Sequence, residues 1–179
     1  MRKIFLLVAM LNILTPVIAQ TIQTYNIDSL KSLLSTDLPD TNRIWVLNNL
    51  GRNIQNSDTI LALAEQAIAL SQKNNFKKGE AEAYNNMGYW FAQKGNYPRS
   101  LESYLKSIQI SESISFEAGL KRSFNNISAI YRSLKDYNTS IRYARRGRDL
   151  SIKLNDLTTL TLSLASLSRS YLELNRTDS

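Results

Sequence analysis

Residues 83–110 read AYNNMGYWFAQKGNYPRSLESYLKSIQI, and forty positions later residues 123–150 read SFNNISAIYRSLKDYNTSIRYARRGRDL. Two adjacent asparagines stand near the start of both stretches, Asn85 and Asn86 in the first and Asn125 and Asn126 in the second. The positions that follow agree in residue class, as in the pairs Met87–Ile127, Phe91–Tyr131, Tyr97–Tyr137, Leu101–Ile141 and Ile110–Leu150. A self-match of this length indicates an internal repeat.

Two further copies flank this pair. Residues 47–70 carry an earlier copy with a slightly shorter turn, and residues 164–175 carry the start of a later one. Within residues 58–70 the apolar side chains recur every three or four positions, which predicts a helix with one apolar stripe, and Asp58 is the candidate N-cap. Gly95 and Asn96 mark the turn of the next pair. One helical hairpin cannot bury its own apolar face, so the hairpins are expected to stack into an elongated superhelix with a groove.

The composition favours helices and excludes much of enzyme chemistry. Only three prolines and six glycines occur among 179 residues, which argues against a turn-rich β architecture. The sequence contains no cysteine and no histidine, which removes disulfides, thiol nucleophiles, imidazole bases and nearly every zinc site. No glycine-rich phosphate loop and no catalytic constellation are present. We therefore expect a protein that is not an enzyme and that uses no cofactor and no metal.

The first 19 residues have the three parts of a secretory signal peptide. Arg2 and Lys3 form the basic start, Ile4 to Leu14 the apolar stretch, and a small-residue cleavage site ends at Ala19. The apolar run is shorter than the roughly 20 residues of a membrane span, which favours cleavage over an uncleaved anchor. The formal net charge of +7 falls to about +5 once Arg2 and Lys3 are removed. We expect an exported protein, in the periplasm or at the extracytoplasmic face of the membrane, that does not bind nucleic acid through this segment.

The repeat resembles the tetratricopeptide repeat (TPR) family over residues 40–179. The first helix of that family's unit carries a large apolar residue, then Leu-Gly or its equivalent, then an aromatic residue, and the second carries small, aromatic and small residues. The matching residues are Tyr84, Met87, Gly88 and Phe91 in the first helix, Gly95, Asn96 and Tyr97 in the turn, and Ser100, Tyr104 and Ser107 in the second helix. The next copy departs from the pattern at Ser128, Lys135 and Ala144.

The resemblance implies an all-α fold, a TPR-like α-solenoid of about three and a half helix-turn-helix hairpins. The expected divisions are a signal peptide (1–19), a leader segment with a short helix (20–39), TPR-like repeats 1 to 3 (40–76, 77–116 and 117–156), and the first helix of a further, truncated repeat (157–179). The forty-residue period is similar to that of long-repeat arrays in bacterial sensor proteins. This similarity implies the exported sensory or docking region of a larger signal-transduction protein of the histidine kinase or helix-turn-helix regulator type. The alternative is a self-contained periplasmic scaffold or adaptor.

The resemblance also implies that the first helix of each hairpin lines a concave groove that binds a protein or an extended peptide. Steps of three and four residues then place one set of polar side chains on that face. The set consists of Asn49, Arg52, Asn86, Tyr89, Gln93, Arg122, Asn126, Arg132 and Arg169. An asparagine amide both donates and accepts, and so can bind the main chain of a peptide. The alternative is that the paired asparagines bond to the neighbouring hairpin and set the stacking.

Two other features have alternative interpretations. Arg142, Arg145, Arg146 and Arg148 gather on one second helix, where they form either an anion site or, as we expect, a solvated convex face with local neutralisation by Asp149. The leucines of residues 157–174 form a wide apolar stripe. Because an array needs a polar cap at its end, we expect the sequence to be part of a longer protein rather than a stack that its last helix caps by itself.

Overall fold

A computed structural model describes residues 26–54 and 58–177, and the predicted signal peptide lies outside these residues. The described part contains helices and no strand, as the sequence predicts. The helices are α3 (Ile27–Leu34), α4 (Asp40–Asn53), α5 (Thr59–Lys73), α6 (Lys77–Gln93), α7 (Tyr97–Ser113), α8 (Glu117–Ser133), α9 (Tyr137–Lys153) and α10 (Leu157–Thr177). None of the helices in the described residues is both long enough and apolar enough to cross a membrane.

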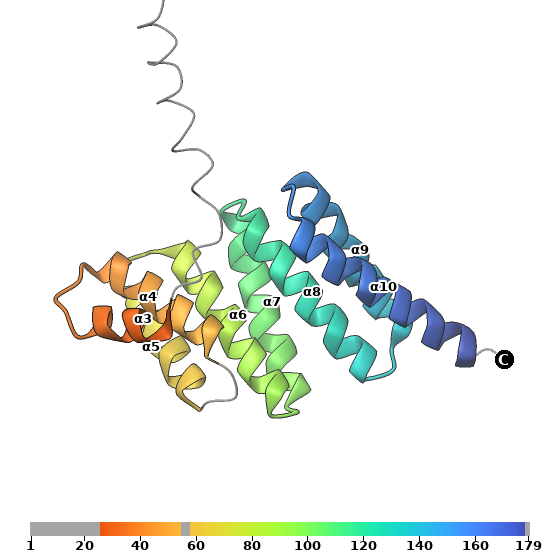
Figure 1. The fold of residues 1–179 in the computed structure, drawn as a ribbon, viewed down its shortest axis with the longest axis horizontal. Helices are drawn as coiled ribbons and strands as arrows, with labels where there is room; N and C mark the ends of the chain where they lie inside the picture. The colour runs from red at the N-terminus through yellow and green to blue at the C-terminus, as the bar shows by residue number, and fades with distance from the viewer. Residues whose placement is uncertain (1–25, 55–57, 178–179) are drawn as a thin grey trace, which may run out of the picture.

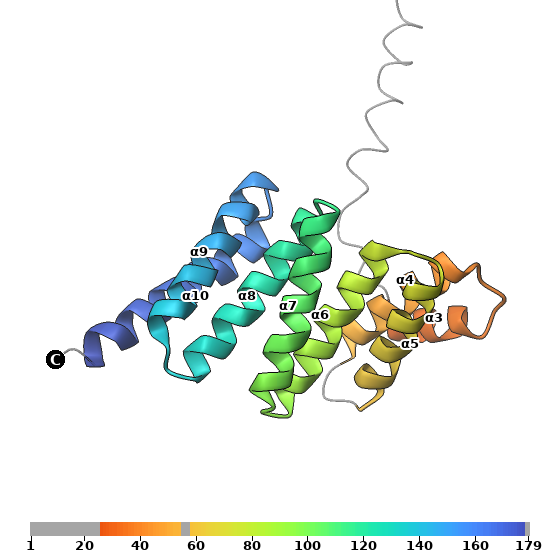
Figure 2. The ribbon, with the colours of Figure 1, turned by 180° about the vertical axis from the view of Figure 1, so that it is seen from behind.

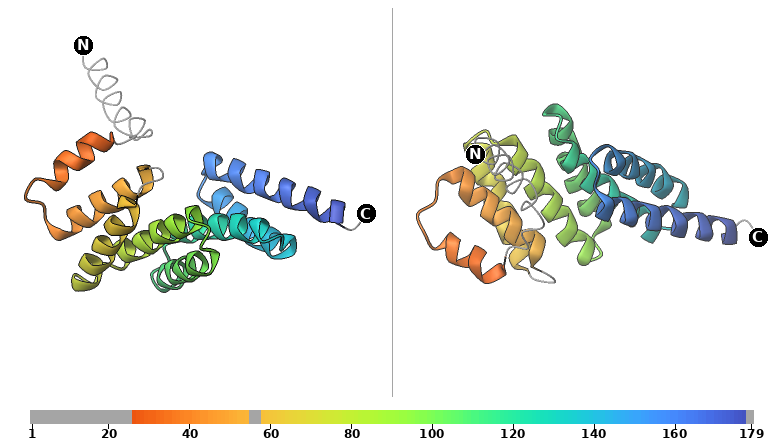
Figure 3. Two further views of the ribbon diagram at one scale, coloured as in Figure 1. Left: turned by 90° about the horizontal axis from the view of Figure 1, so that it is seen from below. Right: turned by 45° about the horizontal axis from the view of Figure 1, so that its top comes forward.

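The helices form an elongated, curved row of antiparallel pairs (Figures 1 and 2). The pairs are α4 with α5, α6 with α7 and α8 with α9, and α10 packs against α9. Each first helix also contacts the first helix of the next pair, so that α4 meets α6, α6 meets α8 and α8 meets α10. In the left view of Figure 3, α4 and α10 rise on the same side of α6 and α8. The first helices therefore line the concave side and the second helices form the convex back.

The turns repeat every twenty residues in one conformation. Positive φ angles occur at the equivalent positions Asn75, Gly95, Ser115, Lys135 and Asn155. At each turn the next backbone N–H donates to a carbonyl five residues earlier, for example Asn96 to Phe91 at 2.9 Å and Asp136 to Tyr131 at 2.9 Å. This is the Schellman arrangement that ends helices at a left-handed residue. Turns within hairpins and turns between hairpins thus have the same geometry, which keeps the array regular.

Helix α3 covers the first hairpin, whereas the outer face of α10 is exposed. Leu30 of α3 is buried in the same apolar cluster as Leu47 and Leu50 of α4. Phe124 of α8 is only 2% exposed, with the α9 residue Arg146 3.9 Å from its ring centroid. The aligned residue of α10, Leu164, is 49% exposed, and among the described residues no helix lies over it as α9 lies over Phe124.

Close packing within one hairpin depends on a glycine. A Cβ atom at Gly88 of α6 would lie 2.7 Å from the Tyr104 ring of α7, which is 1% exposed. The glycine therefore leaves room for the aromatic ring. In the next hairpin Ser128 replaces the glycine and Ala144 replaces the tyrosine, so both members of the pair change together. This explains why the second copy departs from the family pattern at these two positions.

Candidate functional site

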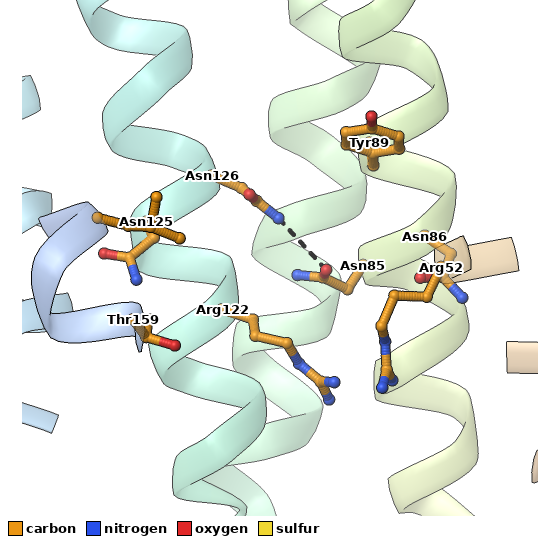
Figure 4. Close-up of a pocket in the computed structure, with 9 residues that line it drawn as sticks. Arg52, Asn85, Asn86, Tyr89, Arg122, Asn125, Asn126 and Thr159 are labelled. Atoms are coloured by element: carbon orange, nitrogen blue, oxygen red, sulfur yellow. Dashed lines mark hydrogen bonds between the residues drawn. The ribbon is translucent and has the colours of Figure 1, made fainter. Parts of the chain in front are cut away.

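Three adjoining cavities lie along the concave face, with volumes of about 300, 230 and 130 Å³. The largest lies between α4, α6, α8 and the start of α10 and is lined by Arg52, Asn85, Asn86, Tyr89, Arg122, Asn125, Asn126, Thr159 and Leu162 (Figure 4). It shares Tyr89 and Asn126 with the second cavity and Arg52 with the third. The shared residues make the cavities successive parts of one groove, which we call the concave groove.

The structure brings together most of the residues that the sequence analysis assigned to the groove. Five of the nine, Arg52, Asn86, Tyr89, Arg122 and Asn126, line the largest cavity. Gln93 lines the second cavity and Asn49 the third. Arg132 and Arg169 line none of these three cavities. Arg132 donates to Ser166 Oγ on α10 at 2.9 Å, and burial together with the nearby charge of Arg169 lowers the pKa of Arg132.

The sequence analysis missed several lining residues. They include Asn85, Asn125, Thr159 and Leu162 in the largest cavity and Trp45, Lys78 and Glu82 in the third. Leu162 occupies the α10 position that aligns with Arg122, so the forty-residue period could have identified it. Lys78 and Glu82 precede Asn86 on α6 in steps of four, and Glu82 also aligns with Arg122, so helical phase and the forty-residue period could have identified these two as well.

Several of the paired asparagines hold neighbouring hairpins together. Asn48, which is fully buried, donates to the Gly79 carbonyl of α6 at 3.0 Å, and Asn86 donates back to the Asn48 carbonyl at 2.9 Å. Asn85 donates to Ser123 Oγ at 2.9 Å and accepts from Asn126 at 3.3 Å. The stacking role considered for these residues is therefore present in the structure. Asn86 and Asn126 also line the groove, so the two roles coexist at these positions.

Asn49 behaves differently from Asn48. Its side-chain amide donates to the Trp45 carbonyl one turn earlier in the same helix, at 2.8 Å. Its side chain therefore bonds within its own helix, although it is only 7% exposed and lines the third cavity. Adjacent asparagines thus have separate tasks, because a step of one residue turns a side chain by about 100° around the helix.

Two arginines share one carboxylate in the groove. Arg122 Nη2 lies 2.8 Å from Glu82 Oε1, and Arg52 Nη2 lies 3.6 Å from the same oxygen. Burial lowers the pKa of Arg52, the charge of Arg122 lowers it further, and Glu82 partly offsets both effects. Figure 4 shows the two guanidinium groups, one from each side of α6, directed toward the same part of the cavity. Lys78 lines the adjoining cavity, so three cationic side chains accompany one carboxylate.

Two donor atoms in the wall of the largest cavity are unpaired. Arg122 Nε and Asn125 Nδ2 are buried, and neither has a hydrogen-bond partner in the described structure. The Asn125 carbonyl oxygen accepts from Ser163 of α10 at 2.8 Å, so the amide is oriented by that bond. A buried donor without a partner is unfavourable by about 1–3 kcal/mol.

Two arginines on the convex back have partners on neighbouring helices. Arg146 lies over Phe124 and 3.5 Å from Glu112, and Arg145 donates to the Tyr171 hydroxyl. Asp149 pairs with its neighbour Arg148 at 2.7 Å rather than with Arg145. The expected N-cap Asp58 makes no bond to the α5 backbone, since its carboxylate pairs with Lys94 at 2.8 Å. Arg145 and Arg146 therefore take part in contacts between helices, whereas Arg148 pairs within its own helix.

The fold and the groove define a helical-repeat solenoid. Residues 79–153 match the model of the tetratricopeptide repeat family, which supports the resemblance found in the sequence. A similar solved structure is BtubC (BKLC) from P. vanneervenii, with a TM-score of 0.60 and 18% sequence identity over 88% of this chain and 61% of that chain. At this identity the likeness concerns the fold, and this chain spans about three fifths of that protein's length. Comparison with curated proteins finds no match.

Proposed function

We propose that this protein is a non-catalytic scaffold whose concave groove binds an extended polypeptide. Tetratricopeptide repeats generally mediate protein–protein interactions, and residues 79–153 match that family. The observation that carries the proposal is the groove itself, in which three adjoining cavities along the first helices are lined by amides, a tyrosine and arginines. Amides can bond both to N–H and to C=O groups of an extended main chain.

Substitution of Tyr89 tests this proposal. Tyr89 lines both the largest and the second cavity, and it is half-buried. Peptides selected from a random library against the purified protein should bind Tyr89→Ala at least about tenfold more weakly, because tyrosine is a frequent hot spot of interfaces. The measurement is fluorescence anisotropy. Leu105→Ala, on the convex helix α7 and 50% exposed, is the matched control and should bind as the unchanged protein does. Selected peptides that bind both variants equally would contradict a groove site.

The double substitution of Asn86 and Asn126 is a poor test of the groove. Both residues bond across hairpins, so their loss would loosen the stack as well as alter the groove. Tyr89 makes no such hydrogen bond in the described structure. The tyrosine therefore separates binding from stability better than the asparagines do.

We also propose that the protein is exported and forms the sensory or docking region of a larger bacterial signalling protein. The first 19 residues support export, and the exposed leucine face of α10 supports a further packing partner. N-terminal sequencing of the protein recovered from the periplasm should start at Gln20, because cleavage after Ala19 fits the small-residue site. Recovery from the cytoplasm with residues 1–19 still attached would contradict export. A reading frame that continues into a membrane span and an output domain would support the larger protein.

A further inference from the structure

The largest cavity of the concave groove has an excess of hydrogen-bond donors and of positive charge. Arg52 and Arg122 approach it from α4 and α8, and Asn125 and Asn126 add amide groups from α8. Glu82 is the carboxylate bound to both arginines, and Lys78 lines the adjoining cavity. Together, the three positive groups and one negative group carry a net charge of about +2. Arginine matches a carboxylate with two parallel donors, so a second carboxylate is the ligand group that this charge distribution favours.

The Arg122 guanidinium can take a further acceptor. Arg122 already uses Nη2 for Glu82, while its Nε atom is buried and has no partner in the described structure. A guanidinium group only donates, so its remaining N–H groups require acceptors. The lowered pKa of Arg52 is consistent with a missing negative partner. Burial and the charge of Arg122 disfavour the charged form of Arg52, whereas a nearby anion would favour that charged form.

We propose that this cavity holds the side-chain carboxylate of an aspartate or glutamate within the bound polypeptide, between Arg52 and Arg122. The inference rests on the proposed function and adds the chemistry of the partner. An internal side chain fits better than a chain terminus, because the groove continues past the cavity on both sides through shared residues. In this arrangement Glu82 orients the two arginines and, as a negative charge beside the site, also opposes the incoming carboxylate.

The test compares three fluorescein-labelled ten-residue peptides built from alternating serine and alanine. The first has two central glutamates and an amidated C-terminus, the second has two glutamines in their place, and the third is the glutamine peptide with a free C-terminal carboxylate. The measured quantity is the ratio of dissociation constants between the glutamine and glutamate peptides at low salt. A ratio reports the preference for the carboxylate and is insensitive to a uniform change in binding.

In the unchanged protein the glutamate peptide should bind about tenfold or more tightly than the glutamine peptide, as expected for a carboxylate placed between two guanidinium groups. Arg122→Gln should reduce this ratio toward one, and Arg52→Gln provides a second variant, at a more exposed side chain, if the first does not fold. Glu82→Gln should raise the ratio about fivefold, because it removes the opposing charge. Arg142→Gln, an exposed position on α9 with the same change in net charge, should leave the ratio unaltered.

A ratio near one in the unchanged protein would overturn the inference, and so would an equal effect of Arg142→Gln and Arg122→Gln. Failure of the glutamate peptide to bind at all would overturn it as well. Preference for the free C-terminal carboxylate over the glutamates would replace the internal side chain by a chain terminus. Peptides that bind in a Tyr89-dependent manner without a glutamate preference would leave the proposed function intact, which separates the two failures.

Discussion

Tyr104→Ala should lower the free energy of unfolding by about 3–5 kcal/mol, the usual loss for a fully buried aromatic side chain. Tyr104 is 1% exposed and its hydrophobic neighbours include Ile108 and Phe124. Gly88→Ala should also destabilise the protein, by about 1–3 kcal/mol, because its Cβ atom would lie 2.7 Å from the Tyr104 ring and would force this buried ring to shift. Urea denaturation followed by circular dichroism measures both losses.

The combined variant gives the stricter test of this packing pair. Once Tyr104 is alanine, the steric conflict at position 88 is gone, and the higher helix propensity of alanine should make Gly88→Ala neutral or stabilising by up to about 1 kcal/mol. Gly88→Ala is thus expected to be destabilising when Tyr104 is present and neutral or stabilising when it is alanine. Such a dependence shows that the two residues are energetically coupled through their contact. The next hairpin, with Ser128 and Ala144, already has two small residues at these positions. Additive losses in the combined variant would contradict the proposed contact.

Asn48→Ala should destabilise the protein by about 1–3 kcal/mol, whereas Asn49→Ala should have little effect. Asn48 is fully buried and donates to the Gly79 carbonyl of the next hairpin at 3.0 Å, so its removal loses a buried bond between hairpins. The Asn49 side chain instead donates to the Trp45 carbonyl of its own helix, and alanine is the better helix former. Urea denaturation of the two variants is the measurement. Equal losses, or a larger loss at Asn49, would show that the hairpins are held in another register.

The repeat predicts the fold because each helical hairpin has an apolar face that it can bury only against the next hairpin. The forty-residue period aligned Asn85 with Asn125 and Met87 with Ile127, and the structure places α6 and α8 side by side as the alignment requires. The turns were harder to predict, since only Gly95 among the five left-handed turn residues is a glycine. Asn75, Ser115 and Lys135 adopt the same conformation within the twenty-residue half-period. Position in the repeat, rather than residue type, identifies these turns.

The groove residues could be predicted in part from helical phase alone. Tyr89, Arg122 and Asn126 were placed on the concave face by steps of three and four, and they line the largest cavity. Phase did not reveal the contacts of Asn86, because the partner carbonyl of Asn48 lies 38 positions away in the sequence. The ion pairs of Glu82 could not be predicted either, because its partners Arg52 and Arg122 come from different hairpins. Contacts between hairpins require the stacking register, which the structure supplies.

Photo-crosslinking tests most directly whether the concave face is the binding face. A benzophenone amino acid placed at residue 89, between the first two cavities, should crosslink a peptide selected from the random library. The same group at residue 105, which is exposed on the convex helix α7, should crosslink little or none of it. The account predicts a crosslinked product at residue 89 that disappears when unlabelled peptide competes. Crosslinking at residue 105 in preference to residue 89 would contradict the central claim that the first helices form the polypeptide-binding groove.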